Sequence, residues 1–382
     1  MGKFDLQKDF IEYWDEVVRQ WLEKNANYSE FENNAKEQSL IINAINDMFG
    51  DKPEYRLNTI HMPEPYWGNP TDCSIVLMNY NPAGGPRVNR HTTISCKDCT
   101  GCEPLSDKDK KIIPSMTFIK YVDDKVKEGE NGYSSIALTG PVFKAKNGFE
   151  WFWDKDNGYE GYDWWQQKTD WLDHLVEIIC GQKSEKRLPF AMELCGWHSK
   201  EWKTDLSWID KESCRTIIQK RTILPLLDAM KNSLQGSSTK IAVCIGAGFT
   251  PSVLADFFNC NEDEFDVTGR VLSALLTKQD EPQDVEYKIL GKDEIQSKKR
   301  LGKESKRSIG VAVNKGSEDK VETTRYYRVY KVDKNGDYII FNTFAPGGNR
   351  HPAEHFRDFE KDLLSMIIEK KWKQEKDLFA DF

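Results

Sequence analysis

The stretch SIVLMNYNPAGGP, residues 74–86, decides the fold that this sequence predicts. It begins as a short apolar run, which is typical of a buried strand, and it ends in small residues that permit tight loops. Ligands of open α/β folds bind outside the carboxyl ends of the strands. We therefore expect this strand to deliver polar groups to a functional site.

Three later segments repeat this pattern of an apolar run followed by small or polar residues, and they are residues 190–194, 241–245 and 338–344. Helical patterns separate or follow them, at residues 164–180, 216–234, 252–258 and 353–370. Strands that alternate with helices predict a parallel sheet. The expected fold class is therefore α/β, with three α/β/α layers around a central, mainly parallel four-stranded sheet.

The N-terminal part of the chain is predicted to be helical. Apolar side chains recur at helical spacing over residues 5–24 and again over residues 36–49. We expect residues 1–56 to form an N-terminal helical cap and residues 57–382 to form the α/β domain.

The composition favours a globular protein of the cytoplasm. Its 382 residues include 12 Trp and 19 Phe, which supply apolar surface for a large core. No run of about 18 apolar residues is present, and the N-terminus carries charges where a signal peptide needs an apolar segment. We therefore expect a cytoplasmic location and no membrane partner. Cysteines that stand alone within apolar runs, such as Cys195 and Cys244, predict reduced core thiols.

The order of the motifs resembles the uracil-DNA glycosylase superfamily. The first predicted strand ends in Asn79-Tyr80-Asn81-Pro82, the third reads IAVCIGAG, and the last leads to a His351-Pro352 loop before the final helix. The loop after the first strand is closest to the Asn-Pro-Gly form of the mismatch-type members. The resemblance implies a monofunctional DNA glycosylase, which hydrolyses the N-glycosidic bond of an altered or modified base flipped out of DNA.

The resemblance also implies roles for individual residues. Asn81 would hold the attacking water, and His351 would stabilise the leaving base. Further residues expected to bind the substrate are Tyr80, Pro82, Gly84, Gly85, Glu193, His198 and Asn349. The superfamily often reads the base with an Asn where this chain has CGWHS at 195–199, so the resemblance does not define the base. In one interpretation His198 reads the base and Glu193 supports it from within the sheet; in the other His198 caps a turn, and Glu193 pairs with a basic side chain.

A cysteine cluster lies in the polar loop that follows the Asn-Pro motif. Cys96, Cys99 and Cys102 form a C-x2-C-x2-C pattern, and His91 lies five residues upstream of it. Three thiolates and an imidazole at this spacing suit a Cys3His zinc site. An iron–sulfur cluster, for which Cys73 could be a distant fourth ligand, and metal-free thiols are the alternatives.

Two insertions are predicted within the α/β domain, at residues 87–160 and 260–336. Aromatic residues at 149–165 could stack on bases or could fasten the first insertion to the core. The second insertion is basic over residues 288–307, which could follow a phosphate backbone or remain in solvent. Its residues 321–332 alternate in polarity as a strand does.

Two other function classes are compatible with these features. The net charge of −8 disfavours a chain whose whole surface binds nucleic acid, although a local basic face is compatible with it. A hydrolase that acts on free nucleotides suits this charge better. A catalytically inactive sensor that binds a nucleobase or nucleic acid is the other alternative.

Overall fold

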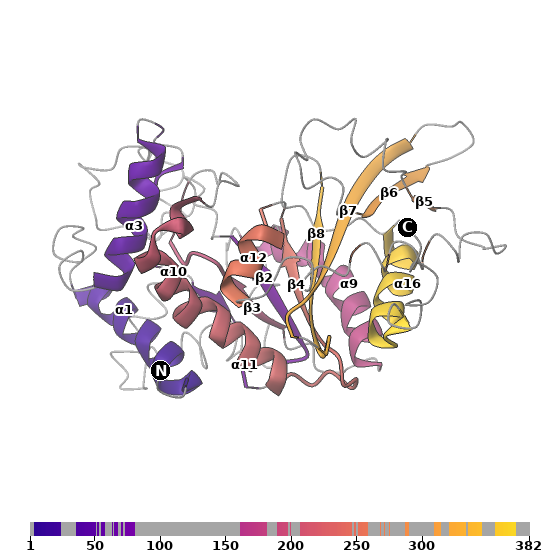
Figure 1. Ribbon diagram of the computed structural model, residues 1–382, viewed down its shortest axis with the longest axis horizontal. Coiled ribbons are helices and arrows are strands. Elements are labelled where there is room, and N and C mark those ends of the chain that lie inside the picture. The colour runs from indigo at the N-terminus through magenta and orange to yellow at the C-terminus, as the bar shows by residue number, and fades with distance from the viewer. Residues whose placement is uncertain are drawn as a thin grey trace, which may run out of the picture. The chain divides into compact units, whose positions relative to one another are not determined.

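Figure 1 shows the computed structural model of the chain. The main stretches that the structure describes are residues 4–23, 36–50, 73–80, 161–181, 189–197, 207–246, 251–258, 309–314, 321–333, 335–345 and 356–371, with shorter pieces between them. The chain divides into two units, which are described separately. Unit 1 comprises Met1–Cys73, Met78–Gln167 and Lys186–Asn232, and unit 2 comprises Ser74–Leu77, Lys168–Glu185 and Ser233–Phe382.

The described part of unit 1 is mainly helical. Its helical elements, in chain order, are η1 (Gln7–Ile11), α1 (Glu12–Glu23), α3 (Lys36–Phe49), η4 (Ser207–Asp210), α10 (Glu212–Ile218), η5 (Gln219–Ile223) and α11 (Leu224–Asn232). The helices predicted at 5–24, 36–49 and 216–234 are therefore confirmed. Phe10 packs against Tyr66 and Phe190, with ring centroids 4.5 and 6.3 Å away. This aromatic contact holds the first helical segment on the strands of the unit.

Strands of unit 1 lie in the order β1-β3-β2. The short β1 (Tyr66–Trp67) pairs antiparallel with β3 (Pro189–Glu193), with Tyr66 opposite Met192. On the other side of β3 lies β2 (Ile75–Asn79), whose last two residues belong to this unit. All five residues of β2 are buried, as the apolar run at the start of the deciding stretch predicts.

Unit 2 contains a mixed sheet. Across this sheet the strands are the first part of β2, then β4 (Lys240–Ile245), β8 (Tyr338–Phe344), β7 (Val321–Lys331), β6 (Ile309–Asn314) and β5 (Tyr287–Ile289). β4 and β8 pair in parallel, whereas β8, β7, β6 and β5 pair antiparallel in turn. Every residue of β4 and β8 after the first of each strand is buried, so these two strands form the centre of the unit's core.

The expected number of four strands is wrong, although the α/β class is confirmed. The four predicted strands are present as β2, β3, β4 and β8, but unit 2 alone contains five complete strands, β4 to β8. The additional strands of unit 2 come from the second predicted insertion, and β7 covers the alternating segment predicted at 321–332 except its last residue. The predicted insertion therefore extends the sheet.

The turn between β7 and β8 explains why these two strands pair antiparallel. The Asp333 carboxylate accepts hydrogen bonds from the backbone N–H groups of Asn335 at 2.9 Å and Tyr338 at 2.7 Å. Gly336 has a φ of 68°, a left-handed conformation that costs glycine little. A connection this short can join antiparallel neighbours only, since parallel strands need a long crossover.

Three helices of unit 2 accompany its sheet, and they are α9 (Gly161–Cys180, within this unit from residue 168), α12 (Pro251–Phe258) and α16 (Arg357–Ile368). Each confirms a predicted helix. Figure 1 shows α9 and α16 next to each other, near β7 and β8. Among the residues that the structure describes, no helix is both long enough and apolar enough to cross a membrane.

Candidate functional site

The ends of β2 and β3 lie side by side in unit 1. The backbone N–H of Leu194 donates to the carbonyl oxygen of Asn79 at 2.8 Å, and that of Cys195 donates to the carbonyl oxygen of Tyr80 at 2.7 Å. These two bonds continue the pairing past the last residue of each strand. The chain therefore leaves the sheet from adjacent positions at the two points where the sequence predicts functional loops.

A side-chain hydrogen bond also joins the two strand ends. Asn79 Nδ2 donates to Glu193 Oε1 at 3.2 Å, and Asn79 is 7% exposed while Glu193 is half-buried. Asn79 Oδ1 is buried, and no donor in the described part of the chain reaches it. Buried polar atoms are normally satisfied, so this oxygen marks a position where a polar partner would be stabilised.

Two of the predicted substrate-binding residues, Tyr80 and Glu193, lie at the paired ends of β2 and β3. Glu193 bonds with the amide of Asn79, which favours neither of the two interpretations made from the sequence. The Tyr80 side chain is 1% exposed, so a base would reach its ring only inside the protein. The remaining predicted catalytic and binding residues lie outside the described residues, and they are Asn81, Pro82, Gly84, Gly85, His198, Asn349 and His351.

The predicted metal ligands His91, Cys96, Cys99 and Cys102 also lie outside the described residues, as do the first insertion up to residue 160 and the basic residues 290–307. Cys73, the distant ligand of the iron–sulfur alternative, is a buried free thiol near the carbonyl oxygen of Ala229. Within the described ranges, no three His, Cys, Asp or Glu side chains are grouped as metal ligands would be.

The predicted core thiols are confirmed. Cys195 and Cys244 are free and buried. Burial raises the pKa of Cys195 to about 12 and raises the pKa of Cys244 as well. Both side chains are therefore neutral thiols at physiological pH, and neither is suited to act as a nucleophile.

The segment after β3 is tightly packed. A Cβ atom at Gly196 would lie 2.9 Å from Cα of Pro65, closer than side-chain atoms normally approach a backbone, so this position requires glycine. Next to it, the Trp197 side chain is completely buried, and its Nε1 donates to Gln38 Oε1 at 2.9 Å. Two residues of the predicted base-reading segment are thus held in place, Gly196 against Pro65 just before β1 and Trp197 against helix α3.

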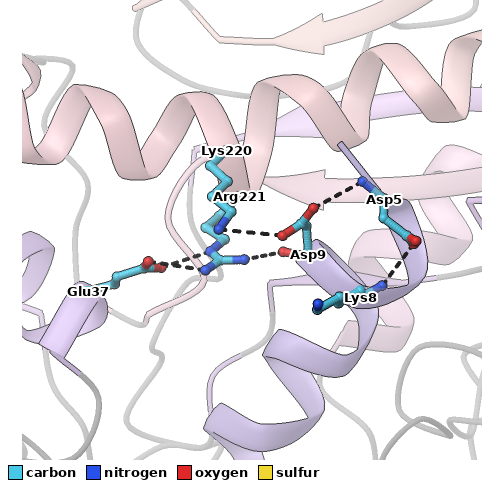
Figure 2. Close-up of polar contacts among 6 residues, drawn as sticks. All are labelled: Asp5, Lys8, Asp9, Glu37, Lys220 and Arg221. Atoms are coloured by element: carbon cyan, nitrogen blue, oxygen red, sulfur yellow. Dashed lines mark hydrogen bonds and ion pairs between the residues drawn. The ribbon is translucent and has the colours of Figure 1, made fainter. Parts of the chain in front are cut away.

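A second cluster in unit 1 is centred on Arg221, which Figure 2 shows between two helical segments. Its Nε and Nη2 donate to the Glu37 carboxylate at 2.8 and 3.1 Å, and its Nη1 donates to the carbonyl oxygen of Asp9. The guanidinium also lies 3.6 Å from the ring centroid of Tyr13. These contacts use the forked geometry and the flat face of the guanidinium together.

Two members of this cluster lie in π-helical turns, which are uncommon in proteins and often occur at functional sites. Arg221 belongs to η5 and Asp9 to η1. The Asp9 carboxylate accepts from the Asp5 backbone N–H and pairs with Lys220 at 3.4 Å. The Asp5 hydrogen bond, followed by the Lys220 charge, lowers the pKa of the Asp9 carboxyl.

Unit 2 contains a separate buried cluster around Glu360, which is completely buried in α16. Its carboxylate accepts from Trp171 Nε1 of α9 at 2.9 Å and from the Tyr327 hydroxyl of β7 at 3.0 Å. His174 Nε2 lies 4.0 Å from the same carboxylate. Burial raises the pKa of Glu360 to about 7 and lowers the pKa of His174. The cluster joins two helices to the sheet, and sequence reasoning did not find it.

Comparisons of the chain with protein-family models, with curated proteins and with solved structures found no match. The resemblance to uracil-DNA glycosylases accordingly stays a prediction from the order of its motifs.

Proposed function

We propose that this chain is a DNA glycosylase-like hydrolase with a three-layer α/β/α core, which releases an altered or modified base from DNA. The observation that carries the proposal is the backbone pairing of Tyr80 with Cys195 at 2.7 Å. Asn81 follows Tyr80 directly, so the Asn-Pro loop and the predicted base-reading segment begin at adjacent points. Ligands of α/β folds bind at such strand ends.

The proposed reaction divides the work between two residues. Water, oriented by the Asn81 amide, attacks the sugar C1′, the C1′–N bond breaks, and its electron pair leaves with the base. His351 donates a hydrogen bond to the departing base as negative charge develops on it, and the proton lost by the water finally neutralises the base. An amide is a weak base, so the mechanism depends on a loose, oxocarbenium-like transition state and a good leaving group.

The other predicted residues serve binding. Gly84 and Gly85 let backbone N–H groups approach a phosphate, and His198 reads the flipped base. Asn79 and Glu193 support the site from the ends of the strands, because their mutual hydrogen bond fixes the orientation of both side chains. No lysine lies in either motif, which is consistent with hydrolysis without a lyase step.

The test of this proposal is base release from duplex and single-stranded DNA that carries a panel of altered bases, detected by alkaline cleavage at the abasic sites. We expect product with the wild-type chain, none with Asn81→Ala and less with His351→Ala. Asn232→Ala is the matched control, because Asn232 is exposed at the end of α11, where it bonds with Asp228 one turn earlier in the same helix. Base release that persists in Asn81→Ala rejects the catalytic assignment.

The net charge of −8 favours one competing class, the hydrolysis of free nucleotides. Salt separates the two classes, because DNA affinity falls steeply as the salt concentration rises and small-nucleotide binding does not. Activity on free nucleotides that is insensitive to salt, with no base release from DNA, would replace the glycosylase proposal.

A further inference from the structure

Trp197 is connected to the N-terminal helices through one buried amide. The indole N–H of Trp197 donates to Gln38 Oε1 at 2.9 Å, and Gln38 Nε2 donates to the Tyr13 hydroxyl at 2.7 Å. Gln38 is 2% exposed. Because an indole N–H is a donor only, the amide must present its oxygen to Trp197 and its nitrogen to Tyr13. Gln38 therefore has a single orientation that satisfies both neighbours.

The far end of this connection is held by the Arg221 cluster. The Arg221 guanidinium stacks on the Tyr13 ring and binds Glu37, which precedes Gln38 in α3. The Arg221 side chain is 9% exposed, so water screens these contacts little. Burial raises the pKa of Tyr13 well above its usual range, which keeps the hydroxyl neutral and able to accept from Gln38. Each group in the chain of contacts is thus fixed by the next.

We infer that the N-terminal helices position the end of β3 for base recognition, with Gln38 as the positioning residue that acts through Trp197. This inference rests on the proposed function, because His198, the predicted base reader, follows Trp197 in the chain. The physical reason is that a buried indole whose N–H loses its acceptor must move or remain unsatisfied. A shift of the indole displaces the segment that begins at Cys195, whose N–H is paired with Tyr80, and an unsatisfied N–H weakens the packing that holds this segment.

The experiment compares the wild-type chain with Gln38→Met and Gln38→Glu. Methionine removes both hydrogen bonds at similar volume, whereas glutamate retains an acceptor for Trp197. Gln235→Met is the matched control in unit 2: Gln235 is also buried and also makes two hydrogen bonds, with the backbone N–H and carbonyl of Ile241. Tyr13→Phe, which deletes only the hydroxyl that accepts from Gln38, is a second variant in case Gln38→Met does not fold.

Two measurements are made on each variant. The first is hydrogen exchange of the backbone amides at residues 194–197, which reports how firmly the end of β3 is held. We expect exchange in Gln38→Met to be faster by about tenfold or more, and exchange in Gln38→Glu and Gln235→Met to match the wild type. The second is kcat/KM for base release, which should fall by about tenfold or more in Gln38→Met alone, since small displacements of a binding group are costly.

The outcomes separate this inference from the proposed function. Equal exchange at residues 194–197 in Gln38→Met and Gln235→Met overturns the inference, whatever the activity. Faster exchange with unchanged kcat/KM overturns the role in base recognition. If the wild type releases no base from any DNA, the proposed function fails and the recognition role fails with it, while the exchange data still decide whether the N-terminal helices hold the end of β3.

Discussion

Asn79 and Glu193 face each other across the ends of two adjacent strands, with Asn79 Nδ2 3.2 Å from Glu193 Oε1. The pair matches a half-buried carboxylate with a neutral amide. The amide is a neutral donor, so this hydrogen bond brings no positive charge to the Glu193 carboxylate. Asn79 Oδ1 is buried and no donor among the described residues reaches it, so a hydrogen-bond donor is the group that this position would bind.

Asn79→Asp should destabilise the chain, because it replaces the donor with a second carboxylate. We expect the free energy of unfolding to fall by about 1–3 kcal/mol at pH 8, because the hydrogen bond is lost and an acidic group takes its place. Urea unfolding at pH 8 measures this effect.

The double variant Asn79→Asp with Glu193→Gln is the control for that experiment. It reverses the donor and the acceptor, so we expect it to recover most of the stability at pH 8. A single variant Asn79→Asp that is as stable as the wild type at pH 8 would show that the hydrogen bond seen between the two strand ends contributes nothing.

The sequence predicted the helices and four of the strands because each of them has a local pattern. An apolar run ending in small residues identified β2, β3, β4 and β8, and helical spacing identified α9 and α16. β6 was not predicted, although most of its residues are apolar, because it follows the basic residues 288–307 within the second insertion and that insertion was interpreted by its charge. The alternation of polar and apolar residues predicted β7. Its position next to β8 was not predicted, because that position depends on the short turn between the two strands.

The interactions at the candidate site could not be predicted, because they join residues far apart in the chain. Gln38 and Trp197 are separated by 159 positions, and Glu37 and Arg221 by 184. Each of these residues lies on a helix or in a loop, and its type and neighbours in the sequence give no sign of a partner so far away in the chain. Asn79 could have been recognised from the sequence, because it is a polar residue at the end of an apolar run. The sequence analysis included it only as part of the motif around Asn81.

Arg221→Lys should weaken unit 1 although it keeps the charge. Lysine cannot bind Glu37 through two nitrogen atoms, as the guanidinium does in Figure 2, and also cover the Tyr13 ring, whose centroid lies 3.6 Å from the guanidinium carbon. We expect the free energy of unfolding to fall by about 1–3 kcal/mol in denaturant experiments. The neighbouring ion pair provides the control: Lys220 is 44% exposed, so Lys220→Ala should change stability by less than about 1 kcal/mol. Equal losses in the two variants would contradict the role given to the guanidinium.

Glu360 should make the stability of unit 2 depend on pH. Its pKa of about 7 in the folded chain lies above its ordinary value of 4.5, so the folded chain binds more protons than the unfolded chain between these values. Stability from this residue is therefore present at low pH and is lost as the pH rises through 7, by up to about 3 kcal/mol. The pKa of His174 is shifted downward by burial and gives a slope of the opposite sign.

Glu360→Gln isolates the contribution of the carboxyl, because glutamine retains an oxygen for Trp171 and an amide for Tyr327. We expect the stability of this variant relative to the wild type to rise between pH 4.5 and pH 8. Arg325, which is buried nearby and donates to Thr343, is present in both proteins. A stability difference that stays constant over this pH range would refute the raised pKa.

Cys99→Ser should abolish metal binding if the C-x2-C-x2-C pattern and His91 form the proposed zinc site. A tetrahedral structural site needs four ligands, so the loss of one thiolate weakens binding strongly, and the wild type should contain about one zinc per chain. Cys180→Ser is the matched control, because Cys180 is a half-buried free thiol of α9, and its zinc content should equal that of the wild type. Metal analysis of the three purified proteins decides between the alternatives: iron with visible absorption identifies an iron–sulfur cluster, and equal zinc in Cys99→Ser and the wild type excludes Cys99 as a ligand.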